Sequence, residues 1–351
     1  MRVALILCLL GATLNATESV RIGVNLSLAP GGVASAIELR DAMLIAQEEL
    51  NARPETLYKY ELLFEDNSAN SRGSALASQK LIHIDKVDAL ITVFDYAIAP
   101  SVPLAKQANI ASVGIGWGAS LIDGKHSFLF GWSELSQANR LADYLESKQN
   151  KKITIIAARQ AGVPGIVKRI QERLAGMQKP TVIWYNREDW DLRPMLLRVK
   201  ESNPDCLVLL SWDSDFKKIM YQLKQMPEFK PELIGLGFSF RFAEDRTQTI
   251  GAVFVASKEY PTVLCQKYEI RYHRKITHDY APYAYDGVKF LANILEKSPN
   301  DRTPIRQRFL NVLRSTQRFD GATGNYTQDG GVFDTTSSLY RITPKGEVQV
   351  P

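Results

Sequence analysis

The sequence predicts an α/β fold with two similar lobes, each built on a parallel sheet flanked by helices. The chain has 351 residues, more than one hydrophobic core usually holds, so we expect two domains. Short apolar runs alternate with amphipathic segments along most of it. The runs at 153–158 and 206–210 are apolar throughout, which indicates strands buried on both faces. Repeated β-α-β units of this kind place ligand sites at the carboxyl ends of the strands.

The first half of the chain supplies the opening strands and helices. We expect strands at 20–28, 60–65, 87–94 and 110–115, and helices at 39–50, 71–84 and 99–108. The first helix is indicated by apolar residues at i, i+3, i+4, i+7 and i+11, which share one helical face: Leu39, Ala42, Met43, Ala46 and Leu50. Pro100 and Pro103 fit the third helix if they lie in its first turn.

The second half repeats the alternation, so the two series are expected to join near Trp132. We expect strands at 153–158, 181–185, 206–211 and 233–236, and helices at 163–174, 192–200 and 214–225. Helices at 262–273 and 283–296 follow. A glycine-containing turn at 321–325 then leads into an extended stretch that ends at Val350.

The N-terminus has the plan of a secretory signal peptide. Arg2 is followed by an apolar run at 3–10, and a polar stretch begins at Thr17. This order predicts a signal peptide over residues 1–16, with cleavage near Ala16 and export to the periplasm. An uncleaved N-terminal anchor is the alternative, but the apolar run is too short to span a bilayer.

Composition and charge exclude several classes of protein. The net charge of +5 is mild, and the basic cluster at 271–275 fits a solvated helical face better than a nucleic-acid or membrane contact. Cys206 and Cys265 remain after the signal peptide; Cys206 is expected to be a buried thiol, and a disulfide between the two stays open. The cysteines and histidines lack the spacing of a metal site.

Enzyme and cofactor motifs are also missing. The sequence contains no G-x-S-x-G, no Walker loop and no H-E-x-x-H, so we expect no catalysis. Residues 114–119 fit G-x-G-x-x-A, a dinucleotide fingerprint, but Gly124 comes before the helix that this motif needs. We therefore expect no cofactor.

Six segments carry motifs in a fixed order: RIGV at 21–24, LAPG at 28–31, DAMLIAQEELN at 41–51, LFEDN at 63–67, LIHIDKVDALI at 81–91 and YDGV at 285–288. Together they resemble the leucine/isoleucine/valine-binding family, the type I periplasmic solute-binding proteins of ABC importers. The resemblance covers essentially the whole mature chain. It implies two Rossmann-like lobes joined by three hinge crossovers, with a cleft between them that closes on a solute.

The resemblance also implies where the lobes divide. The crossovers are expected near Trp132, at 256–261 and at 323–325. Lobe one is then 17–132 plus 260–323, and lobe two is 133–259 plus 324–351. The expected partners are a small-molecule solute and the membrane permease of an ABC transporter, and we expect a monomer.

In lobe one, two loops are implied as ligand contacts. The first contains Phe94, Asp95 and Tyr96. It lacks the hydroxyl run of the family, and an anionic Asp95 would repel a ligand carboxylate. The second contains Gly116 and Gly118, whose backbone N–H groups can approach an anion closely, and Trp117, which could stack on the ligand. Ordinary loop and buried-core roles are the alternatives.

In lobe two, Trp212 and Asp213 follow a predicted buried strand. Trp212 is expected to be an aromatic contact that faces Trp117 across the cleft. Asp213 could receive a ligand ammonium or cap the next helix. Tyr285 could line the cleft or lie in the core. The acidic residue that the family's amino-acid binders place near 236–239 is absent.

These features predict a periplasmic protein that captures a small organic ligand, amino-acid-like or an aromatic or apolar carboxylate, and delivers it to an ABC importer. A periplasmic ligand sensor on the same fold is the alternative.

Overall fold

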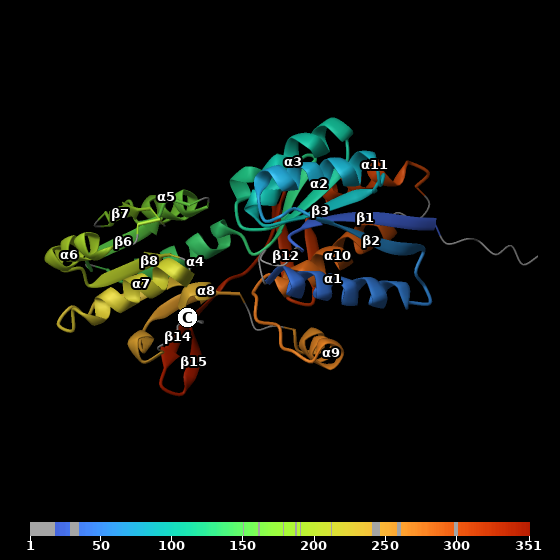
Figure 1. Ribbon diagram of the computed structural model, residues 1–351. Helices are drawn as coiled ribbons and strands as arrows, with labels where there is room; N and C mark the ends of the chain where they lie inside the picture. The colour runs from blue at the N-terminus through green and yellow to red at the C-terminus, as the bar shows by residue number, and fades with distance from the viewer. Residues whose placement is uncertain are drawn as a thin grey trace, which may run out of the picture.

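The computed structural model describes residues 18–351 except 29–34, 150, 161, 178, 187, 190, 212, 241–245, 258–260 and 298–300. The expected signal peptide at 1–16 lies outside the described residues. No helix in the described part of the chain is long and apolar enough to cross a membrane. Two sheets, each covered by helices, form two lobes that lie next to each other (Figure 1).

Lobe one is built on an eight-stranded sheet in the order β11-β12-β13-β5-β4-β3-β1-β2. Neighbouring strands from β13 to β2 are parallel, whereas β11 and β12 add an antiparallel edge. The strands are β1 (Glu18–Leu26), β2 (Tyr58–Asp66), β3 (Ala89–Val93), β4 (Ala111–Ile115), β5 (Ser127–Gly131), β11 (Arg318–Gly321), β12 (Gly324–Asp329) and β13 (Val332–Thr335).

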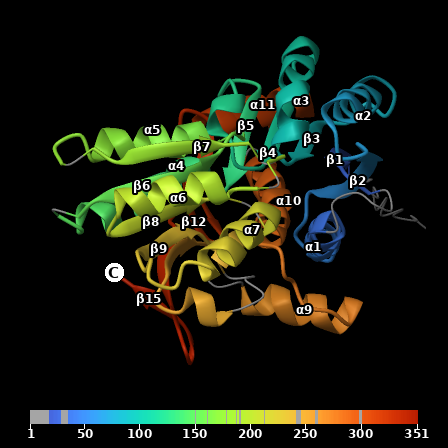
Figure 2. The same cartoon turned by 60° about the vertical axis from the view of Figure 1, so that its left-hand side comes forward.

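Helices cover both faces of this sheet. Helices α1 (Ser35–Asn51) and α10 (Ala281–Glu296) pack together on one face, with α9 (Thr262–Tyr272) and α11 (Ile305–Ser315) beside them. Helices α2 (Ser71–His83) and α3 (Asp95–Ala108) cover the opposite face (Figures 1 and 2).

Helix α3 begins at Asp95, earlier than expected, so Pro100 and Pro103 lie inside it rather than in its first turn. A proline inside a helix leaves a carbonyl of the preceding turn without its backbone donor. Here those carbonyls belong to Tyr96 and Ala99, four residues before Pro100 and Pro103.

Lobe two is built on a seven-stranded sheet in the order β15-β14-β10-β9-β8-β6-β7. In this order, neighbouring strands from β10 to β7, including β6, are parallel. Strand β14 pairs antiparallel with both β10 and β15. The strands are β6 (Ile153–Ala158), β7 (Thr181–Tyr185), β8 (Cys206–Leu210), β9 (Glu232–Leu236), β10 (Val253–Ala256), β14 (Ser338–Thr343) and β15 (Gly346–Val350).

The helices of lobe two explain why strands β6 and β8 are buried at every position. Ile155 in β6 packs in the core under α4 (Glu134–Glu146) and α5 (Val163–Arg173). Ile156, the next residue, packs in a separate core under α6 (Arg193–Ser202), α7 (Asp213–Lys224) and α8 (Gly237–Phe240). Successive side chains point to opposite faces of a strand, and here both faces are covered. The prediction of a two-lobed α/β fold with mostly parallel sheets is confirmed.

The chain crosses between the sheets after β5, after β10 and after β13. The third crossing differs from the expectation at 323–325, because β12 and β13 pair with the sheet of lobe one. The polypeptide leaves that sheet only after Thr335, so 324–335 belong to lobe one. The first and third crossings are bonded to each other: Trp132 Nε1 donates to Ser337 Oγ at 2.6 Å.

Cys206 in β8 and Cys265 in α9 are both free thiols. Burial raises the pKa of the Cys206 thiol to about 11, so it behaves as a small core side chain rather than as a reactive thiolate.

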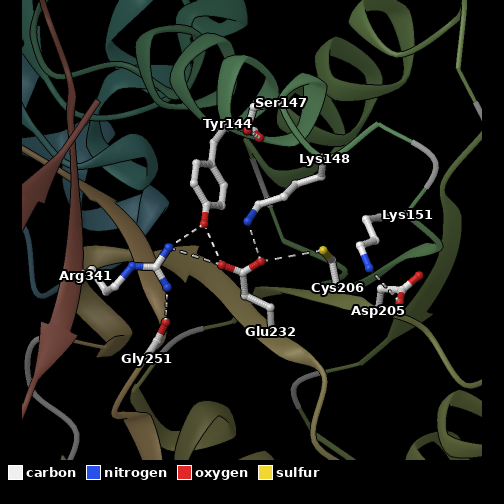
Figure 3. A network of polar contacts seen from close by, with 9 residues as sticks. All are labelled: Tyr144, Ser147, Lys148, Lys151, Asp205, Cys206, Glu232, Gly251 and Arg341. Atoms are coloured by element: carbon white, nitrogen blue, oxygen red, sulfur yellow. Dashed lines mark hydrogen bonds and ion pairs between the residues drawn. The ribbon is translucent and has the colours of Figure 1, made fainter.

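A polar network ties together elements of lobe two that are far apart in sequence (Figure 3). The Glu232 carboxylate, at the start of β9, accepts a hydrogen bond from Tyr144 Oη at 2.5 Å. The same carboxylate pairs with Lys148 Nζ at 2.8 Å and with Arg341 in β14 at 3.4 Å. Burial alone would raise the pKa of Glu232, but the hydrogen bonds from Lys148 and Tyr144 hold it below its ordinary value.

We predict that Glu232→Gln lowers the free energy of unfolding at pH 7 by about 1–3 kcal/mol, because two cationic groups lose their common partner. A carboxylate with a depressed pKa stabilises the fold above its unfolded pKa and loses that effect as the pH falls through its folded pKa. The difference between the variant and the wild type should therefore be full near pH 7 and shrink as the pH falls below the ordinary pKa of a glutamate, about 4.3.

Urea unfolding at pH 3 to 8 measures this difference. The exposed Glu172 is the control, because its ion pairs lie at the surface and Glu172→Gln should change stability little. A difference for Glu232→Gln that does not depend on pH contradicts the prediction.

Candidate functional site

Two loops implied as ligand contacts lie side by side at the carboxyl edge of lobe one. Strands β3 and β4 are parallel neighbours, with Val93 opposite Ile115. The residues that follow each strand must therefore emerge together, and the Phe94 amide donates to the Ile115 carbonyl at 2.9 Å. Asp95 opens helix α3, and the loop at 116–118 leads into a short 3₁₀ turn, η1 (Ala119–Leu121).

The backbone donors of the second loop are occupied by carboxylates of the protein itself. Asp95 Oδ1 accepts hydrogen bonds from the Trp117 amide at 2.9 Å and the Gly118 amide at 3.1 Å. Both oxygens of Glu134, the first residue of α4, lie 2.9 Å from the Ala119 amide. Three consecutive N–H groups of this loop are thus already bonded to carboxylates.

Gly116 explains how Asp95 comes so close. A Cβ atom on Gly116 would lie 2.4 Å from Ile98 Cδ1 and 2.9 Å from Asp95 Oδ1. A larger residue would therefore displace the carboxylate. The sequence predicts that glycine lets this loop approach an anion, and in the structure that anion is Asp95.

Burial makes the acidic groups around this loop hard to ionise. It raises the pKa of Asp95. It also raises the pKa of Glu134 to about 7, and the nearby Asp95 and Asp334 add to this effect. Asp334, at the end of β13, is bonded to Ser133 through both the amide and the hydroxyl of that serine, and burial raises its pKa to about 6.

An aromatic cluster surrounds the first loop. The Phe94 ring lies 5.9 Å from Tyr96, 5.8 Å from His278 and 6.4 Å from Tyr280, between ring centroids. Tyr280 Oη donates to the Trp132 carbonyl at 3.2 Å, which connects the cluster to the first crossing. Asp95 and Glu134 are among the charges that raise the pKa of Tyr280, after its burial.

Trp117 packs against the other lobe. Its side chain is only 7% exposed. A Cβ atom on Gly162, which precedes α5, would lie 2.6 Å from Trp117 Cε3. The indole ring of lobe one therefore rests on the backbone of Gly162 in lobe two. The two carboxyl edges meet at this contact.

Tyr285 lies away from these loops. Its hydroxyl donates to Glu49 Oε2 at 2.5 Å, in the interface between α10 and α1. Tyr283 is two residues earlier, about 200° around the helix, and its ring faces Gly131 at the end of β5. Tyr280 and Tyr283, not Tyr285, are the tyrosines of this segment nearest the crossing.

The predicted contacts of lobe two cannot be placed against Trp117. Trp212 lies outside the described residues, and Asp213 begins α7 with a side chain that is not described. The neighbouring Ser211 follows β8, and its buried hydroxyl has no hydrogen-bond partner in the described part of the chain. The predicted pairing of Trp117 with Trp212 stays a prediction.

Glu134, Asp334, His278 and Tyr280 were not anticipated as site residues. Glu134 follows Ser133, the N-cap of α4. The sequence could have indicated Glu134, because a helix begins directly after the expected crossing at Trp132. Asp334 had no such signal, because its place follows from the pairing of β13 with β5.

A cavity of about 580 Å³ lies elsewhere, at the amino ends of β9 and β10. Its lining includes Met220, Leu223, Phe229, Lys230, Glu232 and Ile250. Because these residues lie at the opposite end of the strands from Gly162 and Ser211, this cavity does not belong to the predicted ligand site.

We predict that Gly162→Ala destabilises the protein by about 1–3 kcal/mol and pushes the lobes apart. The φ angle of Gly162 is +84°, which disfavours any other residue, and the new methyl group would collide with Trp117. Thermal unfolding measures the first effect, and the radius of gyration from small-angle X-ray scattering measures the second. Gly176→Ala is the control, because nothing lies within 4 Å of its added Cβ. Equal effects of the two substitutions would refute the prediction.

A second prediction concerns the ionisation of Glu134. A carboxyl group with a raised pKa stabilises the fold below its unfolded pKa, and this contribution is lost as the pH rises through the folded pKa. Glu134→Gln removes this titration, so wild-type stability should fall relative to the variant between pH 4.5 and about 7, by about 2–3 kcal/mol. Urea unfolding across this range tests the sign, with Glu172→Gln as the control. A difference that stays flat or grows in favour of the wild type contradicts it.

Comparisons with known proteins identify the family to which this chain belongs. The sequence matches the model of the periplasmic binding protein family over residues 19–347. LivJ from Streptococcus pneumoniae, a branched-chain amino acid transporter substrate binding protein solved with isoleucine, is 18% identical with a TM-score of 0.76; the match covers 95% of this chain and 99% of that one. Leucine binding protein LivK from Thermotoga maritima is 18% identical with a TM-score of 0.78, over 95% and 98% of the two chains.

A third similar structure is the solute binding protein of an ABC transporter from Rhodopseudomonas palustris, solved with 3,4-dihydroxy benzoic acid. It is 16% identical with a TM-score of 0.77, over 94% of this chain and 95% of that one. The curated proteins include no match. Because the family model spans nearly the whole described chain, this protein belongs to the periplasmic binding protein family, and its two lobes have the type I fold.

Proposed function

We propose that this protein is a periplasmic solute-binding protein, which captures a small organic ligand between its lobes and delivers it to the permease of an ABC importer without chemical change. The main support is a set of buried hydroxyl groups without partners among the described residues. Ser27, Tyr96 and Ser211 carry such groups just after β1, β3 and β8. Buried polar groups normally form hydrogen bonds, so these hydroxyls are suited to a ligand between the carboxyl edges.

The aromatic cluster beside Tyr96 favours a ligand with an apolar or aromatic body. The sequence also suggests a carboxylate on the ligand. The geometry offers little support for that part, since the amides of Trp117, Gly118 and Ala119 are bonded to Asp95 and Glu134.

Native mass spectrometry of gently purified protein tests the proposal. We expect a bound small molecule that is lost on unfolding. The stripped and refolded protein should regain stability with that molecule, by about 2.7 kcal/mol at a ligand concentration of 100 times Kd. If no solute copurifies and none in a broad panel of amino acids, organic acids and amines raises the Tm, the proposal fails.

Tyr96→Phe sharpens the test, because it removes only the unpartnered hydroxyl. We expect ligand affinity to fall about fivefold to tenfold with no loss of stability in the free protein. Tyr221→Phe is the matched control, since Tyr221 is 69% exposed on α7. Isothermal titration calorimetry measures both. Unchanged affinity in Tyr96→Phe would remove Tyr96 from the ligand contacts.

A further inference from the structure

The loop that could bind an anion is closed by the protein's own acidic side chains. The amides of Trp117 and Gly118 donate to Asp95, and the amide of Ala119 donates to Glu134. A ligand carboxylate at this loop would have to displace a buried carboxylate and would then meet its negative charge. An anionic ligand is therefore disfavoured at this end of the site.

The same geometry leaves a negative acceptor unused. Only Oδ1 of Asp95 takes part in hydrogen bonds, so Oδ2 has no donor among the described residues. Asp95 is partly exposed, whereas Glu134 is 3% exposed. In the described part of the chain, no lysine, arginine or histidine forms an ion pair with either group. Ionising one partly exposed and one buried carboxyl group without a cationic partner is costly, and a positive group beside them lowers that cost.

Independent features at the same edge also suit a ligand. The hydroxyl of Ser27, a residue that is 2% exposed, has no partner in the described chain. Because Asn25 lies opposite Thr92 in the parallel pair of β1 and β3, Ser27 emerges next to Phe94, the residue before Asp95. The Phe94 ring lies 5.9 Å from the Tyr96 ring and 6.4 Å from the Tyr280 ring, between centroids, so this aromatic cluster includes both neighbours of Asp95 in the sequence. Aromatic faces beside carboxylates are the surroundings that bind ammonium groups.

We propose that the ligand of this site is an organic cation without a carboxylate, namely an amine or quaternary ammonium compound with an apolar or aromatic body. Its positive group bonds to Asp95 Oδ2, and its body lies against Phe94, Tyr96 and Tyr280. This inference rests on the proposed function, because it names the class of solute that the protein captures.

Matched pairs of probes that differ in charge test the inference directly. Isothermal titration calorimetry is run on stripped, refolded wild-type protein with benzylamine and benzoate, phenethylamine and phenylacetate, and isoamylamine and isovalerate. The amine of at least one pair should bind at least tenfold more tightly than its carboxylate partner. Asp95→Asn keeps an acceptor for the two amides and removes the charge, so it should weaken amine binding at least tenfold.

Asp320→Asn is the control, since Asp320 is 67% exposed in strand β11, and it should leave binding unchanged. Thermal unfolding of each free variant shows that it is folded. Tighter binding of the carboxylates, or amine binding that Asp95→Asn does not weaken, overturns the inference while the proposed function stands.

If no probe binds, the copurified solute decides. A cation without a carboxylate supports the inference, and a solute with a carboxylate overturns it. If no solute copurifies and no compound of the broad panel binds, the proposed function fails, and this inference fails with it.

Discussion

The carboxylate of Asp95 is the contact on which the geometry of the site depends. It joins the start of α3 to the loop after β4 and so fixes the relative positions of two segments that are 22 residues apart. Gly116 makes the contact possible, and the charge-assisted hydrogen bonds offset part of the cost of burying the carboxylate. Glu134 repeats the arrangement one residue further along, but from the first helix of lobe two. The loop is thus held by one acidic group from each lobe.

The crossings between the lobes are built from short polar contacts around the same place. Trp132 bonds to Ser337, Ser133 bonds to Asp334, and Ser136 Oγ donates to the Thr335 carbonyl at 2.7 Å. These contacts connect the first crossing and the start of α4 to the end of β13 and to the third crossing that follows it. Any rotation of one lobe against the other must therefore move the first and third crossings together. Glu134 lies at the start of α4 and bonds to the Ala119 amide, so this motion would also reach the loop at 116–119.

The fold could be predicted because its signals are local. A run such as 153–158 is apolar at both faces of a strand, and this pattern requires a covered parallel sheet wherever the strand lies. The third crossing was placed wrongly because the choice of sheet for β12 and β13 depends on pairing with β5, about 200 residues earlier. The resemblance identified the loops at 94–96 and 116–118, and the parallel register of β3 and β4 explains why they meet. It could not show that the loop donors are bonded to Glu134, because that contact depends on how the lobes are joined.

The position of the Trp117 side chain also depends on how the two lobes are joined, so the sequence alone does not indicate it. Its sequence context, a tryptophan between two glycines, suggests a ring that is free to stack on a ligand. In the structure the ring rests on Gly162 and is nearly buried, so the aromatic surface beside Asp95 comes from Phe94, Tyr96 and Tyr280 instead. Two of these residues flank Asp95 in sequence, while Tyr280 is bonded to the Trp132 carbonyl. A ligand that touches all three rings would therefore contact the first crossing as well as the loop, and its binding energy would depend on the relative position of the two lobes.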